Sequence, residues 1–235
     1  MIPKKIHYCW FGRGEKPQLA KKCIASWKKY CPDYEIIEWN EDNYDLNKNK
    51  YVKYCYENKK WAYLSDYVRL DVVAEYGGIY FDTDVEVIRS FDELLKYEAF
   101  YGFENEEYVA SGLGFGAIAH HKTIESMLEQ YHNLEFDENG MLEFIGCPIL
   151  NTKALLKLGL KQNGERQNVY GAEILPICML NPYENSTGRL VTVENTYSIH
   201  WYAKSALDWK AKLRSKITRP FHRIFGEDCF KRFRK

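Results

Sequence analysis

Apolar and polar residues recur with two different spacings along this chain, and each spacing predicts one kind of element. Short apolar runs between turn residues predict strands, whereas apolar residues three or four positions apart predict helices. The expected strands cover residues 4–10, 34–39, 78–82, 85–87, 100–103, 108–117 and 193–200. The expected helices cover residues 17–30, 50–58, 61–76, 121–132 and 151–157. Strands that alternate with helices in the first half predict a mostly parallel sheet covered by helices, with ligands at the carboxyl ends of its strands.

The segment of residues 61–84 joins a helix, a tight turn and a strand that ends on two acids. Gly77 and Gly78 release the helix into the strand, and Asp82 and Asp84 end it. Because residues two apart in an extended chain point to the same side, both carboxylates are expected to aim at one point beyond the strand. Two such oxygen ligands, with room left for water and phosphate oxygens, suit Mg²⁺ or Mn²⁺ held together with a diphosphate. Taken without its context, an Asp-x-Asp is more often a pair of solvated acids in a turn.

Two charged residues on the preceding helix are expected to reach the same ligand. Asp66 and Arg69 are three positions apart and are therefore neighbours on the helix surface. A pair of this kind is usually a minor salt bridge, but this helix leads directly into the acidic strand end. Tyr80 precedes Asp82 by two residues and shares its side of the strand, so its side chain either contacts ribose or phosphate or packs in the core.

Three blocks of the chain resemble one known family. Residues 65–69 together with residues 77–84 resemble the sugar-binding, Asp-x-Asp-containing glycosyltransferases of family 32. That family includes yeast initiating α-1,6-mannosyltransferase and many bacterial capsule and lipopolysaccharide enzymes, and the catalytic domains of the large clostridial glucosylating toxins are more distant relatives. Residues 2–12 resemble the family's opening strand and residues 197–205 its closing His-Trp segment, in the family's order.

The resemblance implies the GT-A fold, a Rossmann-like, mostly parallel sheet flanked by helices with a mixed acceptor-side half. It also implies a metal-dependent, retaining glycosyltransferase. Such an enzyme would move a hexose or N-acetylhexosamine from a nucleoside diphosphate sugar to a hydroxyl of a capsule, exopolysaccharide or lipopolysaccharide precursor. A UDP-sugar is the favoured donor, with GDP-mannose as the second candidate, and Mn²⁺ or Mg²⁺ is the expected ion.

The resemblance also assigns expected roles to individual residues. Trp10 would stack on the nucleobase, and Gly12 would allow the backbone to approach the donor closely. The expected catalytic residues are Asp66, Arg69, Asp82 and Asp84. The expected donor-binding residues are Trp10, Gly12, Asp66, Arg69, Tyr80, Asp82, His200, Trp201 and Ser205. The expected metal ligands are Asp82, Asp84 and His200, because a neutral imidazole is a credible further Mn²⁺ ligand.

Other segments leave alternatives open. Residues 111–117 are a run of small residues that either cradles the sugar or packs tightly in the sheet. Residues 146–148 resemble the family's loop beside the acceptor. His120 and His121 are expected to begin a helix, not to bind a metal.

Composition and length favour a globular enzyme in a reducing compartment. The 235 residues suit one catalytic domain over residues 1–205 and a basic, aromatic-rich tail over residues 206–235. Seven cysteines, an odd number without any Cys-x-x-Cys, argue against a disulfide framework and against a zinc site. Lys4 and Lys5 interrupt any apolar signal core, and no apolar run approaches the length of a membrane span, so a cytoplasmic protein is expected.

The net charge is zero, but the charge is unevenly distributed. Residues 204–235 hold 11 of the 33 Lys and Arg but only three of the 33 Asp and Glu. Aromatic and aliphatic residues lie among these cations, which predicts an interfacial amphipathic segment of two helices broken at Pro220 and Gly226. This segment would hold the protein on the inner face of the cytoplasmic membrane, near a lipid-linked glycan acceptor. The alternative is a helix packed on the domain with a solvated basic face.

Other functional classes are weaker fits to the sequence. The acidic body and the lack of a recognition motif argue against nucleic acid as a partner. A nucleotidyltransferase or phosphohydrolase could use an Asp-x-Asp with Mg²⁺, but it would usually add a Gly/Lys phosphate loop or further acidic clusters. A non-catalytic glycan-binding module would not need an acidic metal site.

Overall fold

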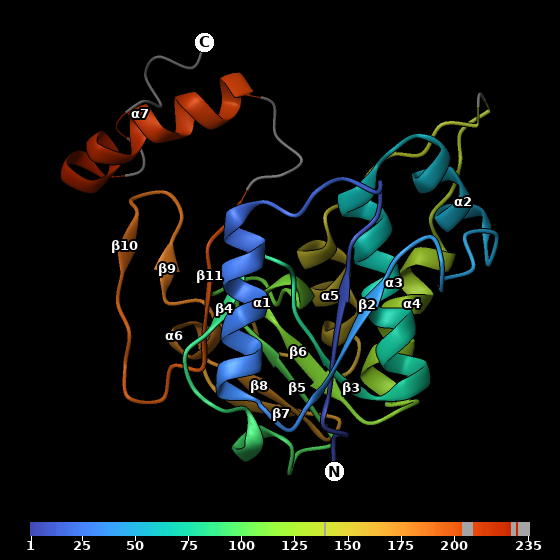
Figure 1. The fold of residues 1–235 in the computed structure, drawn as a ribbon, viewed down its shortest axis with the longest axis horizontal. Helices are drawn as coiled ribbons and strands as arrows, with labels where there is room; N and C mark the ends of the chain where they lie inside the picture. The colour runs from blue at the N-terminus through green and yellow to red at the C-terminus, as the bar shows by residue number, and fades with distance from the viewer. Residues whose placement is uncertain (139, 204–208, 227–228, 230–235) are drawn as a thin grey trace.

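The computed structural model describes residues 1–138, 140–203, 209–226 and 229, and a seven-stranded sheet forms its centre (Figure 1). In spatial order the strands are β2 (Glu35–Trp39), β1 (Lys5–Cys9), β3 (Gly78–Tyr80), β6 (Phe115–Ala117), β5 (Ala99–Gly102), β8 (Ala172–Leu175) and β7 (Gln167–Val169). Strand β1 is parallel to β2 and β3, and β5 is parallel to β8, whereas β6 is antiparallel to both its neighbours and β7 is antiparallel to β8. The expected fold class is therefore confirmed: a Rossmann-like parallel half is followed by a mixed half, as in the GT-A arrangement.

Helices cover both faces of this sheet. The helices of one group pack on one another and on β1 and β3; they are α2 (Lys50–Glu57), α3 (Trp61–Tyr76), α4 (Lys122–His132) and α5 (Cys147–Leu156). On the other face lie α1 (Gln18–Tyr30), α6 (Ile177–Leu180) and a two-stranded ribbon of β4 (Val85–Val87) and β11 (Ser198–His200). Figure 1 shows α1 beside β4 and β11, away from α3 and α4. A second hairpin, β9 (Tyr183–Glu184) with β10 (Arg189–Leu190), lies beyond this ribbon.

Successive side chains of β3 enter two separate cores. Ile79 packs with the α1 side of the sheet, and Tyr80 packs with the α3 side. Both are almost completely buried, as are the residues of the neighbouring strands. Burial on both faces explains why these strands read as continuous apolar runs rather than as alternating ones.

A buried histidine fixes the Gly77–Gly78 turn that leads into β3. Both glycines have positive φ, 62° and 116°, and a Cβ on Gly78 would lie 2.9 Å from Nε2 of His7. Nδ1 of His7 accepts a hydrogen bond from the indole N–H of Trp39 (3.0 Å), so the proton is on Nε2, which donates to the carbonyl of Gly77 (2.9 Å). Burial lowers the pKa of His7 to about 4, so this histidine is neutral.

Several predicted boundaries are wrong, each for a local reason. The strand expected over residues 108–117 is only β6, because a 3-10 turn occupies Ser111–Leu113 and Gly114 has a φ of 108° that no strand continues. The strand expected over 78–82 ends at Tyr80, and the one expected over 193–200 begins at Ser198. Helix α5 begins four residues earlier than expected, because Pro148 is favourable in a first helical turn. His121 caps the start of α4, as predicted.

Within residues 209–226, the described stretch of the tail, one helix forms and the break expected at Pro220 is absent. Helix α7 (Trp209–Phe225) continues through Pro220, whose side chain is exposed, so the proline removes a main-chain hydrogen bond without ending the helix. The helix does end before Gly226, which has a φ of 83°. Figure 1 shows α7 beside the β9–β10 hairpin and apart from the central sheet. None of the described helices combines the length and the apolar character that crossing a bilayer requires.

Candidate active site

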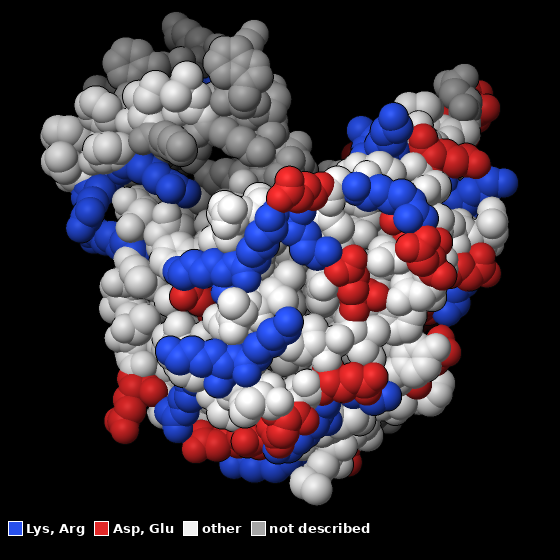
Figure 2. Space-filling model, in the orientation of Figure 1, with Lys and Arg blue, Asp and Glu red and all other residues white. Residues whose placement is uncertain are grey.

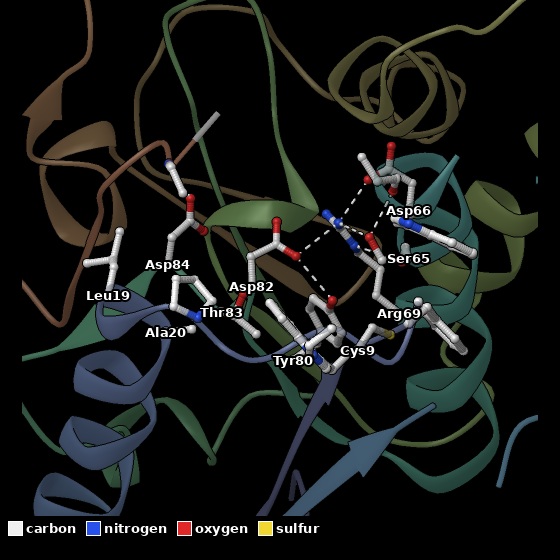
Figure 3. A pocket seen from close by; sticks show the side chains of 18 residues that line it. Cys9, Leu19, Ala20, Ser65, Asp66, Arg69, Tyr80, Asp82, Thr83 and Asp84 are labelled. Carbon is white, nitrogen blue, oxygen red and sulfur yellow. Dashed lines mark hydrogen bonds and ion pairs between the residues drawn. The ribbon is translucent and has the colours of Figure 1, made fainter. Parts of the chain in front are cut away.

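A cavity of about 420 Å³ opens at the carboxyl ends of β1 and β3, between α1 and α3 (Figure 3). Its lining includes most of the residues that the sequence singled out, namely Trp10, Gly12, Asp66, Arg69, Tyr80, Asp82 and Asp84. His200 and Trp201 are not among the lining residues, and Ser205 lies outside the described part of the chain. The carboxyl edge of the parallel strands thus holds the cavity, as expected for an open α/β sheet.

A buried arginine joins the two acids on the α3 side of the cavity. The guanidinium of Arg69 lies 2.8 Å from Asp66 and 3.0 Å from Asp82, and only 3% of the side chain is exposed. Figure 3 shows Arg69 reaching from α3 between these two carboxylates. Burial alone would lower the pKa of Arg69, but Asp82 and Asp66 raise it well above its usual value. The pair expected at a helix surface is therefore a buried ion network, which is a costlier and more specific arrangement.

The two acids of this network have raised pKa values. Burial raises the pKa of Asp66 to about 6, although the charge of Arg69 opposes this shift. Burial also raises the pKa of Asp82, again against Arg69. The phenol of Tyr80 donates a hydrogen bond to Oδ1 of Asp82 (3.1 Å), and its ring faces Arg69 at 5.1 Å. Tyr80 is buried and orients Asp82, while its contact with a donor remains a prediction.

The β4–β11 ribbon brings a histidine from more than 100 residues downstream to the second acid. Nε2 of His200 lies 3.1 Å from Oδ1 of Asp84, and the main-chain N–H of Ala203 donates to Oδ2 of Asp84 (2.7 Å). Burial alone would raise the pKa of Asp84, but His200 and Ala203 hold it below its usual value. Burial opposes protonation of His200, yet Asp84 raises the pKa of His200.

Asp82, Asp84 and His200 fit a divalent cation. One ligand atom from each lies within 4.8 Å of the other two. Two carboxylates and an imidazole are ligands that Mn²⁺ binds readily, and Mg²⁺ would bind the carboxylate oxygens. Nδ1 of His200 is buried and has no hydrogen-bond partner among the described residues. The site therefore has one buried nitrogen that the described protein groups leave without a hydrogen-bond partner.

Sequence reasoning missed some residues that shape this cavity. A Cβ on Gly112 would lie 2.7 Å from Oδ2 of Asp82 and 3.1 Å from Nη1 of Arg69, so only glycine leaves the carboxylate in place. The Sγ of Cys147 lies 3.8 Å from Nη1 of Arg69. The side chain of Trp61 occupies the space that a Cβ on Gly12 would need, at 2.9 Å. The sequence analysis singled out residues 111–117 and 146–148, but no sequence pattern indicated that Gly112 and Cys147 lie close to Arg69.

The two tryptophans with expected donor contacts have different surroundings. Trp10 lines the cavity, and its indole N–H donates to the carbonyl of Gly14 (2.6 Å). Trp201 instead donates to Glu86 (2.8 Å) and packs on Tyr183, with ring centroids 5.2 Å apart. Trp10 therefore lies where a base could stack, whereas the indole of Trp201 is held by Glu86 of β4 and by Tyr183. Both roles in donor binding remain predictions.

Comparisons with known proteins agree with this geometry. Residues 17–101 match the family described as "Glycosyltransferase sugar-binding region containing DXD motif". This part of the chain is thus similar to the sugar-binding region of the DXD glycosyltransferases. The resemblance stated above is thereby confirmed, and the matched range contains Asp66, Arg69, Asp82 and Asp84 but neither Trp10 nor His200.

Two curated glycosyltransferases illustrate the range of relatives. The chain is 32% identical over 110 residues to inositol phosphoceramide mannosyltransferase 3 of Schizosaccharomyces pombe, an alignment that covers 42% of this chain and 28% of that protein. It is 29% identical over 119 residues to human alpha-1,4-N-acetylglucosaminyltransferase, covering 48% of this chain and 30% of that protein. The chain thus spans less than a third of the length of these two relatives.

Two solved glycosyltransferase structures are also similar to this chain. The PaToxG glycosyltransferase has a TM-score of 0.48 at 18% identity, covering 66% of this chain and 68% of that one. A glycosyltransferase involved in the glycosylation of the major capsid of PBCV-1 has a TM-score of 0.49 at 9% identity, covering 91% and 98%.

Proposed function

We propose that this protein is a metal-dependent, retaining glycosyltransferase. It transfers a hexose or N-acetylhexosamine from a nucleoside diphosphate sugar to a hydroxyl of a surface glycan precursor. The observation that carries this proposal is the approach of Asp82, Asp84 and His200 to within 4.8 Å of one another beside the Trp10–Arg69 cavity. The matched family, and relatives named as mannosyl- and N-acetylglucosaminyltransferases, support a hexosyl donor.

Each group in the cavity has a defined task in this reaction. Asp84 and His200, assisted by Asp82, would hold Mn²⁺ or Mg²⁺, which when bound neutralises the charge that accumulates on the departing diphosphate. The indole of Trp10 offers a stacking face for the base, with a UDP-sugar favoured and GDP-mannose the second candidate. The carboxylate of Asp66 would accept hydrogen bonds from the sugar hydroxyls, and the guanidinium of Arg69 would donate hydrogen bonds to them. Retention of configuration follows from the family resemblance.

A donor panel tests this proposal. Full-length protein is incubated with UDP- and GDP-sugars and Mn²⁺, with and without EDTA, and released nucleoside diphosphate is measured. Release from one donor, abolished by EDTA and restored by excess Mn²⁺, is the expected result. Release of monophosphate or pyrophosphate would instead indicate a phosphohydrolase or nucleotidyltransferase. Binding of glycans without any nucleotide release would indicate a non-catalytic glycan-binding module.

A second part of the proposal concerns the tail and its acceptor. On α7 the apolar residues Leu213, Ile217, Phe221, Ile224 and Phe225 follow a helical spacing and are 46–73% exposed. Arg219 lies on the opposite side of the helix and contacts Asn185 in the β9–β10 hairpin, so this packing leaves the apolar stripe exposed. Figure 2 shows Lys and Arg side chains gathered over α1, on the same side of the molecule as α7. These features support attachment to an anionic membrane that carries a lipid-linked acceptor.

Vesicle sedimentation tests the membrane part. Each basic residue near an anionic surface contributes about 1 kcal/mol, and the apolar stripe adds to this. The full chain should sediment with phosphatidylglycerol vesicles and stay in solution with phosphatidylcholine vesicles. An Ile217→Asp, Ile224→Asp double variant should lose sedimentation, whereas Val193→Asp, at an exposed apolar residue outside α7, should keep it. Equal sedimentation of all three proteins would rule the attachment out.

A further inference from the structure

A second cavity, of about 720 Å³, is lined in part by Tyr202, whose ring contacts that of His200. It is an open cavity lined by the loop that follows β5, by α6, by the β9–β10 hairpin and by Tyr202. Figure 1 shows α6, β9 and β11 gathered there, beyond β4. Its volume falls in the range of about 300–1,000 Å³ that small-molecule sites occupy. The mechanism described above does not use this cavity.

Two consecutive residues form the wall between the two cavities. Ala203 lines the first cavity, and its N–H donates to Asp84. Tyr202 lines the second cavity, and its ring centroid lies 4.1 Å from that of His200. Tyr202 has a φ of 50°, which is uncommon for a bulky residue and persists only where the surroundings impose it. A molecule in the second cavity would therefore lie one side chain away from the cluster that would hold the donor diphosphate.

A chain of polar groups lines the second cavity beneath Tyr202. Nδ2 of Asn181 donates to the phenol oxygen of Tyr202 (2.7 Å), and that phenol donates to Oε1 of Glu104 (3.3 Å). Nδ2 of Asn181 also donates to the carbonyl of Glu104 (3.0 Å). Asn181 is only 6% exposed, and its Oδ1 has no hydrogen-bond partner in the part of the chain that the structure describes. A buried acceptor without a partner is costly, and a bound hydroxyl group or water removes that cost.

The charges and rings around the cavity indicate the kind of ligand. Its charged lining residues are the acids Glu104 and Glu184, and none of the described lining residues is Lys or Arg. An anionic ligand would meet two carboxylates, which is unfavourable, and the guanidinium of Arg219, which contacts Asn185, is not itself among the lining residues. Tyr183 and Tyr202 offer apolar ring faces with polar tips, and Asn185 and Ser186 add neutral polar groups. These are groups that recognise a neutral molecule rich in hydroxyls.

We infer that the second cavity binds the acceptor and selects a neutral saccharide over an acidic one. This inference rests on the proposed function, because only a glycosyl transfer requires a second saccharide beside the donor. Glu104 and Asn181 would accept hydrogen bonds from hydroxyl groups of the acceptor sugar. Because Tyr202 and Ala203 are consecutive and each lines one cavity, the acceptor would lie beside the site proposed for the donor.

A cavity-filling variant tests the location. Val191 lines the cavity and is exposed, so Val191→Trp fills space without disturbing the core, and Val193→Trp is the matched control outside the cavity. Binding of methyl α-D-mannopyranoside, methyl N-acetyl-β-D-glucosaminide and methyl β-D-glucuronide to the full chain is measured by saturation-transfer NMR with UDP and Mn²⁺ present. At least one neutral glycoside should bind to wild type and Val193→Trp at least ~10-fold more tightly than to Val191→Trp. The glucuronide should bind to none of them.

A second variant tests the polar recognition. Glu104→Gln removes the carboxylate but keeps its shape, and Glu107→Gln changes an exposed acid of the same loop that does not line the cavity. Affinity for the neutral glycoside should fall ~5- to 10-fold in Glu104→Gln, as for the loss of one charge-assisted hydrogen bond, and stay unchanged in Glu107→Gln.

The outcomes that overturn this inference differ from those that overturn the proposed function. Equal glycoside binding by Val191→Trp and wild type, equal binding of the glucuronide, or no glycoside binding at all would each overturn the assignment of the cavity. Absence of metal-dependent diphosphate release from the donor panel would overturn the proposed function, and glycoside binding is measured without any donor turnover. Unchanged UDP binding in Val191→Trp is expected, because the residue lies outside the donor cavity.

Discussion

His7 and His200 lie in two regions of the molecule that differ in how fully the protein matches their polar and charged groups. The inner region lies under the Gly77–Gly78 turn and along α3. There His7 has both ring nitrogens matched by protein groups, and Arg69 is matched by two carboxylates. The outer region, at the β4–β11 ribbon, contains Asp84 and His200, and His200 keeps a buried Nδ1 without a partner in the described chain.

The pKa values follow the same division. Burial lowers the pKa of His7 to about 4, and the hydrogen bond to Gly77 and the charge of Glu35 oppose this shift only in part. The pKa of His200 is raised instead, since Asp84 outweighs the effect of burial. The charges of the inner region are thus matched by protein groups, although Asp66 and Arg69 also line the cavity, whereas the outer region can gain a proton or a cation. We expect changes at Arg69 to reduce stability as well as activity, and changes at Asp84 or His200 to reduce activity alone.

The largest expected effect is on stability, in the inner region. Arg69→Met leaves Asp66 and Asp82 buried without their cation, which costs about 3–5 kcal/mol. Urea unfolding should show this loss, and Arg69→Lys should show a smaller one because it keeps the charge but not the forked geometry. Arg13→Met is the control: Arg13 and its partner Asp42 are both mostly exposed, so the change should hardly alter stability. Similar losses for Arg69→Met and Arg13→Met would mean that the inner network does not carry stability.

Acid should weaken the inner region through His7. In the folded protein its pKa is lowered from 6.5 to about 4, so the unfolded chain takes up the proton first as pH falls. The free energy of unfolding should therefore decline between about pH 6.5 and pH 4, by about 3 kcal/mol, and His7 should have no further effect below that window. The measurement is the difference in pH dependence between wild type and His7→Gln. Parallel pH profiles for the two proteins would contradict a neutral, buried His7.

Asp84→Asn should separate activity from stability in the outer region. The variant keeps the size of the side chain but removes the charge that a hard cation requires, so diphosphate release should fall at least ~100-fold, while circular dichroism still shows a folded protein. Asp92→Asn, at an exposed acid paired with Lys4, should leave turnover unchanged. Near-normal activity of Asp84→Asn would exclude the metal role of this residue.

Gly112→Ala tests whether the position of the Asp82 carboxylate, which lies between the two regions, limits the reaction. The added Cβ would lie 2.7 Å from Oδ2 of Asp82, so the carboxylate must move away from its present position. Turnover should fall at least ~10-fold, since a misplacement of about 1 Å can cost about 100-fold, and stability should fall less than in Arg69→Met because the cation remains. Gly146→Ala is the matched control, because its Cβ would meet only Pro148, at 3.7 Å. If the two variants have the same turnover, the position of Asp82 does not limit the reaction.

Much of the fold and part of the site could be read from local patterns. Periodicity located the helices and strands of the first half, and the spacing of Asp66, Arg69, Asp82 and Asp84 placed them within one helix–turn–strand unit. Because that unit is continuous in sequence, its side chains must lie near one another wherever it folds. The predicted element boundaries were wrong where the conformation of a single residue starts or ends an element, as at Gly114 and Pro148. The break predicted at Pro220 was wrong for the same reason: α7 continues through this residue, since an exposed proline does not always end a helix.

The sequence by itself determined the α/β class, the carboxyl-edge location of the cavity and the acidic pair at the end of β3. Those features depend on short-range periodicity and on the fixed geometry of extended chain. Only the tertiary structure decided that Arg69 is buried between two acids, that the β4–β11 ribbon brings His200 to Asp84, and that Asn181, Tyr202 and Glu104 share one cavity. These contacts join segments far apart in the chain. Their distances depend on how the helices and the ribbon pack on the two faces of the sheet, which no local spacing records.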